Sequence, residues 1–152
     1  MTDSSDTPVA RETIHATSVA IRGRGVLILG PSGSGKSDLA LRLIDRGASL
    51  ISDDYTVASS PDGRLLLDAP PNIAGRMEIR HLGIVDIPCV GGVPANLVIE
   101  LKDSPPRMPD QDQTFCIAGI LLPLVTLSGL EPSAPIKVEF ALDGLRERGN
   151  RR

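Results

Sequence analysis

The segment GPSGSGKS, residues 30–37, constrains the fold of this chain more than any other. It fits the pattern G-x-x-x-x-G-K-[ST] at every fixed position. The apolar run VLIL, residues 26–29, comes directly before it, and the segment after it carries apolar residues at helical spacing up to Gly47. The context is therefore a buried strand, a glycine-rich turn and an amphipathic helix that ends at a glycine.

This strand, turn and helix predict a cradle for phosphate groups. Gly33 and Gly35 let the backbone turn so that several N–H groups point at one anion, and the start of the helix adds its positive end. Lys36 would reach the β- and γ-phosphates of a nucleotide, and the Ser37 hydroxyl would bind Mg²⁺. The predicted nucleotide-binding residues are Gly30, Pro31, Ser32, Gly33, Ser34, Gly35, Lys36 and Ser37.

Two adjacent carboxylates, Asp53 and Asp54, end the next apolar run, ASLIS at residues 48–52. Strand, helix and strand within about 30 residues predict a parallel βαβ unit, which brings the ends of both strands to one edge of the sheet. The acids would then lie beside the glycine turn. Neighbouring strand residues point to opposite faces, so that one acid faces the site and the other orients metal-bound water or a loop. The residues alone do not rank the pair.

The rest of the chain predicts one domain. We expect a mobile segment at 1–13, a single domain at 14–148 and a tail at 149–152. The predicted elements are strands at 14–21, 26–29, 48–52 and 95–101, a glycine turn at 22–25, a hairpin turning at Asp62-Gly63, a loop at 70–77, an extended piece at 78–87, a polar loop at 102–113, strand material at 115–127, and a closing helix with Ser133 as N-cap and Phe140 facing the core.

Composition excludes several classes of protein. A net charge of −3 argues against a nucleic-acid binder, and two Phe, one Tyr and no Trp offer no stacking platform. The sequence has no apolar run long enough for a membrane span, and its polar start does not resemble a signal peptide. We therefore expect a cytoplasmic protein without membrane partners. Cys89 and Cys116 fit no metal or redox spacing, and we expect both to be buried thiols.

Two segments together resemble the C-terminal catalytic domain of the HPr kinase/phosphorylase family. One runs from IHATSVAI through GPSGSGKS to LISDD, and the other is EIRHLGIVDI at 78–87. The resemblance covers about residues 12–127. It implies an α/β fold with a P-loop-containing core similar to the nucleotide-binding domain of phosphoenolpyruvate carboxykinase, with a mixed sheet and flanking helices.

The resemblance also implies an activity. Members use ATP and Mg²⁺ to phosphorylate a serine of HPr, the small phosphocarrier of the sugar phosphotransferase system. The same site removes that phosphate by phosphorolysis, which consumes inorganic phosphate and releases pyrophosphate. The implied partner is HPr or an HPr-like phosphocarrier, and a homo-oligomer is compatible with the family.

The resemblance also assigns roles to individual residues, by their position in the matching segments. Asp54 matches the catalytic carboxylate, with Asp53 in support, and His15, on the strand before the glycine turn, matches an active-site histidine. Lys36 and Ser37 keep the roles given above.

In EIRHLGIVDI, Glu78 matches a second Mg²⁺-linked acid, and Arg80 offers a guanidinium to phosphate. Their side chains share a face if this piece is extended. Without the resemblance, Glu78 and Arg80 would be taken for an exposed ion pair.

The sequence departs from the family in three places. The family usually carries an N-terminal domain that this sequence lacks. After LLPLVTL it has an arginine-bearing loop that belongs to the catalytic set, where this chain has SGLEPSAPIK, and His81 stands where glycine is common. Two alternatives remain open: a nucleotide-binding regulatory module without turnover, and a small-molecule P-loop kinase. The latter would need an arginine-bearing lid, for which the loop 102–113 offers only Arg107.

Overall fold

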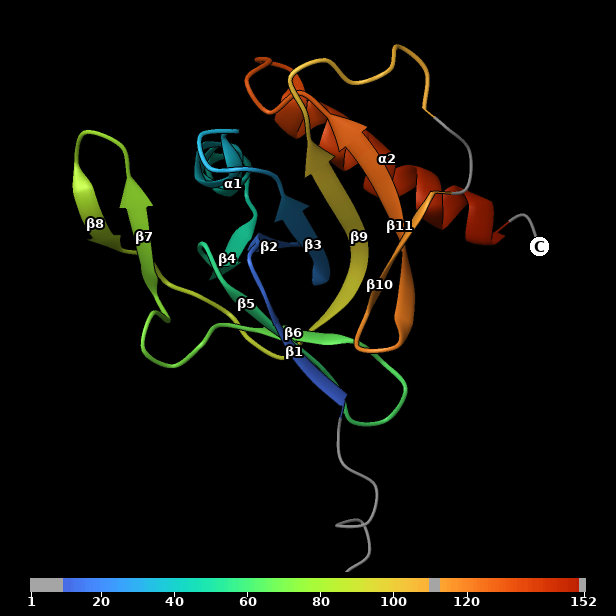
Figure 1. Cartoon of the computed structure of the whole chain (residues 1–152), viewed down its shortest axis with the longest axis horizontal. Coiled ribbons are helices and arrows are strands. Elements are labelled where there is room, and N and C mark those ends of the chain that lie inside the picture. Colours follow the sequence, from blue (N-terminus) through green and yellow to red (C-terminus); the bar gives the residue numbers. More distant parts are fainter. Residues whose placement is uncertain (1–9, 110–112, 151–152) are drawn as a thin grey trace, which may run out of the picture.

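The structure is a computed structural model that describes residues 10–109 and 113–150. Along these residues, three strands are followed by a helix, eight further strands and a second helix (Figure 1). The elements are β1 (Ala10–Ile14), β2 (Thr17–Ile21), β3 (Arg24–Leu29), α1 (Lys36–Asp45), β4 (Ser49–Ser52), β5 (Thr56–Ser60), β6 (Leu66–Asp68), β7 (Arg76–Ile79), β8 (Gly83–Asp86), β9 (Val93–Leu101), β10 (Thr114–Ile117), β11 (Ile120–Leu127) and α2 (Ala134–Asn150).

One mixed sheet forms the centre of the molecule, as predicted. Its strands follow the order β1-β5-β6-β9-β3-β2-β4, and β11 pairs with β9 and β10. The pairs β3–β9 and β9–β11 are parallel, whereas β2 runs antiparallel to both β3 and β4. The strands on either side of α1 are therefore parallel, as predicted, but β2 lies between them.

This topology gathers several strand ends at one edge of the sheet. Because β2 is antiparallel to its neighbours, its start lies beside the ends of β3 and β4, and the ends of β9 and β11 lie at the same edge. In Figure 1 the arrowheads of β3, β9 and β11 point the same way. The residues that follow or precede these strands are thus close in space although they are far apart in the sequence.

Both helices pack on one face of the sheet. Leu39, Leu43, Val138 and Leu142 from the helices join one apolar cluster with residues of β2, β3, β4 and β9. The other face carries a second cluster, which β5, β6, β10 and β11 cover. All five residues of β2 are buried because the strand lies between these two layers.

Helix α1 ends as the sequence predicts. Gly47 has a φ of 110°, and its N–H donates to Ile44 O at 3.0 Å while Ala48 N–H donates to Leu43 O at 3.0 Å. Arg46, the C-cap residue of α1, forms two hydrogen bonds with Glu139 of α2, at 3.0 and 2.7 Å. This hydrogen-bonded carboxylate raises the pKa of the Arg46 guanidinium and ties the two helices together.

The N-terminal part differs from the prediction. Residues 10–13, expected to be mobile, form most of β1, which pairs antiparallel with β5. The predicted strand 14–21 is broken, because β1 ends at Ile14 and β2 begins at Thr17 and pairs with other strands. His15 therefore lies at a bend between two strands, not on a strand. Residues 1–9 lie outside the described residues.

Three burial predictions are wrong. Phe140 is 73% exposed, because α2 buries Ala134, Val138 and Leu142, and Phe140 lies about 200° around the helix from Val138. Cys89 and Cys116 are both exposed. Cys116 precedes the buried Ile117 in β10, so that it points to the other side of the strand.

The predicted hairpin turn is confirmed, whereas the predicted loop 70–77 is shorter, because β7 begins at Arg76; of the predicted loop 102–113, residues 110–112 lie outside the described residues. β5 and β6 pair antiparallel around the Asp62-Gly63 turn, and α2 begins at Ala134, directly after Ser133. Within the parts of the chain that the structure describes, no helix is long and apolar enough to cross a membrane.

EIRHLGIVDI is not one extended piece. It forms most of the hairpin of β7 and β8, a two-stranded sheet that stands beside α1 (Figure 1). Glu78 lies in β7, but Arg80 lies in the turn at the tip and does not continue the strand. His81, in the same turn, has a φ of 75°, a conformation that favours glycine.

Candidate functional site

The loop of residues 30–35, between β3 and α1, has a backbone that requires glycine. Gly30, Gly33 and Gly35 have φ values of 156°, 83° and 97°. A Cβ at Gly30 would lie 2.6 Å from Ser34 Oγ, whereas a Cβ at Gly33 would meet nothing within 4 Å. The loop is thus tight at its base and open at its tip, so that a ligand can approach the backbone there.

Lys36 spans this glycine loop from inside. Its side chain is buried, and Nζ donates to Gly30 O at 2.8 Å and to Pro31 O at 3.1 Å. The Ser34 N–H donates to the same Pro31 carbonyl at 3.1 Å. Because Lys36 also begins α1, the ammonium group and the positive end of the helix lie together.

Asp53 connects the glycine loop to three other parts of the fold. The residue is 7% exposed. Its Oδ1 accepts from Ser37 Oγ at 2.6 Å and from Thr17 Oγ1 at 3.2 Å, and its Oδ2 accepts from the Glu78 N–H at 3.1 Å. The three donors give both oxygens of this buried carboxylate a hydrogen-bond partner.

Asp54 is turned away from Asp53 by a tight backbone turn. Its φ is 71°, and the Tyr55 N–H donates to Asp53 O at 2.8 Å, which closes a γ-turn around Asp54. The Asp54 N–H donates to Thr17 Oγ1 at 3.2 Å. This turn is rare and strained for a residue other than glycine, and such strain is common at functional sites.

His15 lies beside the Asp54 carboxylate. Its Nε2 is 2.9 Å from Asp54 Oδ1, and the two side chains are 46% and 60% exposed. The ring also stacks on Tyr55, with centroids 5.0 Å apart and planes at 28°. The bend between β1 and β2 thus orients His15 from one side, while Tyr55 supports it from another.

A layer of buried hydroxyl groups supports this turn. Thr56 Oγ1 donates to Ala16 O at 2.8 Å, and Ser18 Oγ lies 2.8 Å from the same Thr56 oxygen. Ser52 Oγ donates to Tyr55 O. The Thr56 bonds join the start of β2 to the start of β5, and the Ser52 bond ties the end of β4 to the turn that carries the acid pair.

The sequence missed two residues of the site and placed one differently. Thr17 contacts both acids, and Tyr55 stacks on His15. The only sequence signal for Thr17 is a hydroxyl in an apolar strand, and for Tyr55 its place directly after the acids. Glu78 comes to the site through its backbone, but Arg80 is exposed in the hairpin turn and does not share an extended face with it.

The side chains at this edge of the sheet could supply two oxygen ligands to a magnesium ion whose other ligands are phosphates and water. Among the residues that the structure describes, no three His, Cys, Asp or Glu side chains form a metal cluster. The Ser37 hydroxyl and the Asp53 carboxylate are nevertheless oxygen donors 2.6 Å apart. Mg²⁺ is commonly bound by one or two such groups together with phosphates and water.

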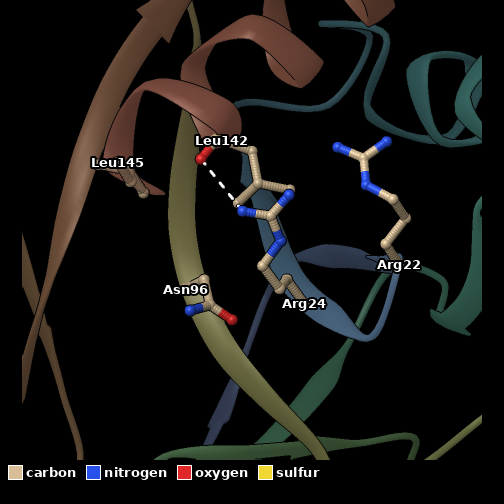
Figure 2. Close-up of a pocket in the computed structure, with 5 residues that line it drawn as sticks. All are labelled: Arg22, Arg24, Asn96, Leu142 and Leu145. Atoms are coloured by element: carbon tan, nitrogen blue, oxygen red, sulfur yellow. Dashed lines mark hydrogen bonds between the residues drawn. The ribbon is translucent and has the colours of Figure 1, made fainter. Parts of the chain in front are cut away.

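A cavity of about 460 Å³ lies at the other end of β3, away from the glycine loop (Figure 2). Arg22, Arg24 and Asn96 line it with leucines of α2, and Arg24 Nη1 donates to Leu142 O at 3.3 Å. Both arginines also pair with Asp143, at 2.8 and 3.2 Å. Because this carboxylate offsets part of their charge and the acids lie at the opposite edge of the sheet, the candidate site is the glycine-loop edge.

Comparison with known proteins identifies the family. Residues 8–127 match the family described as HPr Serine kinase C-terminal domain. The chain belongs to this family. The resemblance inferred from GPSGSGKS, the acid pair and EIRHLGIVDI is therefore confirmed.

Curated relatives carry the name HPr kinase/phosphorylase. The protein of Limosilactobacillus reuteri (strain DSM 20016) is 36% identical over 130 residues, which are 77% of this chain and 41% of the relative. The protein of Lacticaseibacillus casei (strain BL23) is 34% identical over 152 residues, which are 91% of this chain and 46% of the relative. The chain thus spans less than half the length of either relative.

A solved structure shares the fold. The Hpr(Ser) kinase/phosphatase from Coxiella burnetii superposes with a TM-score of 0.79 at 30% identity, covering 91% of this chain and 93% of that chain. This confirms the predicted mixed α/β architecture.

Proposed function

We propose that this chain is an ATP-dependent protein-serine kinase whose acceptor is HPr or an HPr-like phosphocarrier. The observation that carries the proposal is the division of labour within the acid pair. Asp53 is buried and bound to the glycine-loop serine, whereas Asp54 is turned outward beside His15. Phosphoryl transfer needs both a held metal site and a carboxylate free to act on the acceptor. The names of the relatives supply the acceptor.

The glycine loop and Lys36 would bind the phosphates of ATP. The loop N–H groups surround one phosphate, and the Lys36 ammonium neutralises the β- and γ-phosphates. Ser37 and Asp53 would hold Mg²⁺, with Glu78 as a further acid nearby, and the ion neutralises charge on the phosphates when it is bound. Arg80 would approach the transferred phosphate from the hairpin turn.

Asp54 would act as the base in the forward direction. The serine hydroxyl of the acceptor loses its proton to the Asp54 carboxylate while its oxygen forms a bond to the γ-phosphorus. The bond from that phosphorus to the β–γ bridging oxygen breaks, and ADP leaves. His15, 2.9 Å from the carboxylate, would keep it oriented toward the acceptor.

The same groups would carry the reverse phosphorolysis. An oxygen of inorganic phosphate attacks the phosphorus of phosphoserine and gives its proton to Asp54. The bond from phosphorus to the serine oxygen breaks, pyrophosphate forms, and Asp54 returns the proton to the serine oxygen. The name of the relatives, HPr kinase/phosphorylase, supports this reverse reaction.

Intact-mass analysis of HPr tests the proposal. HPr is incubated with the chain and MgATP, and inorganic phosphate is added afterwards. We expect one phosphate on a serine, which the second step removes with release of pyrophosphate. A phosphate that stays would restrict the chain to the kinase reaction.

Unmodified HPr would contradict the proposed kinase. If ATP still binds, the regulatory module without turnover becomes the better account. Transfer of phosphate from ATP to a small molecule in place of HPr would favour the small-molecule kinase.

A further inference from the structure

The loop between β11 and α2 packs against the glycine loop on the side away from the acids. A Cβ added at Gly129 would lie 2.8 Å from Ser34 O and 2.7 Å from Leu101 Cδ1, so the two loop backbones are in contact. Leu130 Cδ2 lies 3.3 Å from the position of a Cβ at Gly35. This loop belongs to SGLEPSAPIK, the segment in which the resemblance leads us to expect an arginine that this chain does not have.

Arg42 of α1 anchors this loop. Its guanidinium donates to Glu131 O at 2.8 Å and to Gly129 O, and it pairs with Asp38 at 3.0 Å. At the other end, the Ala134 N–H donates to Glu131 O at 3.0 Å. The backbone on both sides of Leu130 is thus fixed, while the Leu130 side chain is 70% exposed.

The two sides of the glycine loop differ in chemistry. On the β4 side stand the carboxylates of Asp53 and Asp54 with Thr17 and His15. On the β11 side stand the backbone of Gly129 and the aliphatic side chain of Leu130. A nucleoside triphosphate has the same polarity, with a reacting phosphate at one end and a flat, largely apolar base at the other.

We propose that Leu130, held by the Arg42-anchored loop, is the platform for the base of the nucleotide. The inference rests on the proposed function, because the γ-phosphate must lie on the side of the acids for transfer to occur. The triphosphate would cross the start of α1, and the base would then leave on the β11 side. An exposed leucine on a fixed loop offers a flat base an apolar contact at little cost in conformational entropy.

Calorimetry of the full chain with two ligands tests this inference. MgATP carries the base, whereas magnesium tripolyphosphate has the same anionic part without base or ribose. Leu130→Ala should weaken MgATP binding about five- to tenfold and leave tripolyphosphate binding unchanged. The matched control is Leu121→Ala, which removes a similarly exposed leucine at the opposite end of β11 and should change neither affinity.

The outcomes separate this inference from the proposed function. Unchanged MgATP binding by Leu130→Ala would overturn the platform, as would equal weakening of both ligands, which would indicate an effect on the glycine loop itself. The platform would also be overturned if the wild type bound tripolyphosphate as tightly as MgATP. In that case the glycine loop would still be supported as the phosphate site. A wild-type chain that binds neither ligand would overturn both the inference and the proposed function.

Discussion

The two sides of the glycine loop are held in different ways. On the β4 side, Asp53 accepts hydrogen bonds from Ser37, Thr17 and the Glu78 backbone, which come from three separate elements. On the β11 side, the loop at Gly129 is held by backbone contact, by Arg42 of α1, and by Lys137 of α2, whose Nζ donates to Glu131 Oε1 at 2.9 Å. The β4 side is therefore a network of hydrogen bonds around a buried carboxylate, whereas the β11 side is a loop that packs against the outside of the glycine loop.

Because the two sides are held differently, they should differ in how well they tolerate amino-acid substitutions. In a buried network each group satisfies another, so one substitution leaves several partners unpaired. The loop on the β11 side can vary in sequence if its anchors remain. The segment SGLEPSAPIK, where the resemblance predicts a departure from the family, lies on that side, whereas GPSGSGKS and the acid pair fit the predicted pattern.

The largest expected effect concerns Asp54. Asp54→Asn removes the proposed base while keeping the size of the side chain, and we expect the transfer rate to HPr to fall by about 10²- to 10⁴-fold. MgATP affinity should stay unchanged, because the Asp54 carboxylate contacts His15, whereas Asp53 is the acid that bonds to Ser37. Single-turnover mass analysis and calorimetry measure the two quantities. Transfer at the wild-type rate would remove Asp54 from its role.

The next effect separates the two acids by stability. Asp53→Ala leaves two hydroxyl groups and one N–H without their acceptor, and we expect it to lower the free energy of unfolding by roughly 1–3 kcal/mol. Asp54→Ala should cost less, because the Asp54 side chain is largely exposed. Urea unfolding of the two variants measures the difference. Equal losses of stability would contradict the view that Asp53 alone closes the network.

A smaller effect is expected at the anchor of the other side. Arg42→Lys keeps the charge but loses the planar guanidinium fork, whose Nη1 and Nη2 reach Glu131 O and Gly129 O while Nε pairs with Asp38. We expect the KM for MgATP to rise about fivefold, with kcat nearly unchanged. Arg46→Lys is the matched control, because Arg46 pairs with Glu139 away from the loop. A fall in kcat with constant KM would place Arg42 on the chemical side of the site.

The smallest expected effect tests whether the positive φ of His81 is needed for activity. His81→Gly relieves a φ of 75° in the hairpin turn and should raise the free energy of unfolding by up to about 1 kcal/mol without changing transfer. Asp54→Gly relieves a similar φ of 71° but removes the proposed base. Urea unfolding together with the transfer assay compares them. Loss of activity in His81→Gly would show that the turn conformation of this residue is itself required.

Much of the site followed from the sequence because local patterns determine it. The glycine spacing, the helix after it and Gly47 specify strand, loop and helix, and any parallel pair of strands around α1 brings Gly30 and Asp53 to one edge. That conclusion holds although β2 lies between the two strands, since β2 is antiparallel to both.

What the sequence did not predict depends on long-range pairing. The break at His15 arises because β1 pairs with β5 while β2 pairs with β3 and β4, and no local signal distinguishes these partners. Arg80 does not lie in a strand, because the chain turns at this residue to form the hairpin of β7 and β8. Phe140 is exposed because α2 buries the stripe of Val138 and Leu142, and size alone did not reveal which face was buried.

The rate of HPr phosphorylation as a function of MgATP concentration tests the central claim most directly, when the wild type, Asp54→Asn and Leu130→Ala are compared. The account predicts that Asp54→Asn lowers the maximal rate at constant half-saturation, and that Leu130→Ala raises half-saturation at a constant maximal rate. If both variants changed the same parameter, the two sides of the glycine loop would not divide chemistry from nucleotide binding, and the account would be wrong.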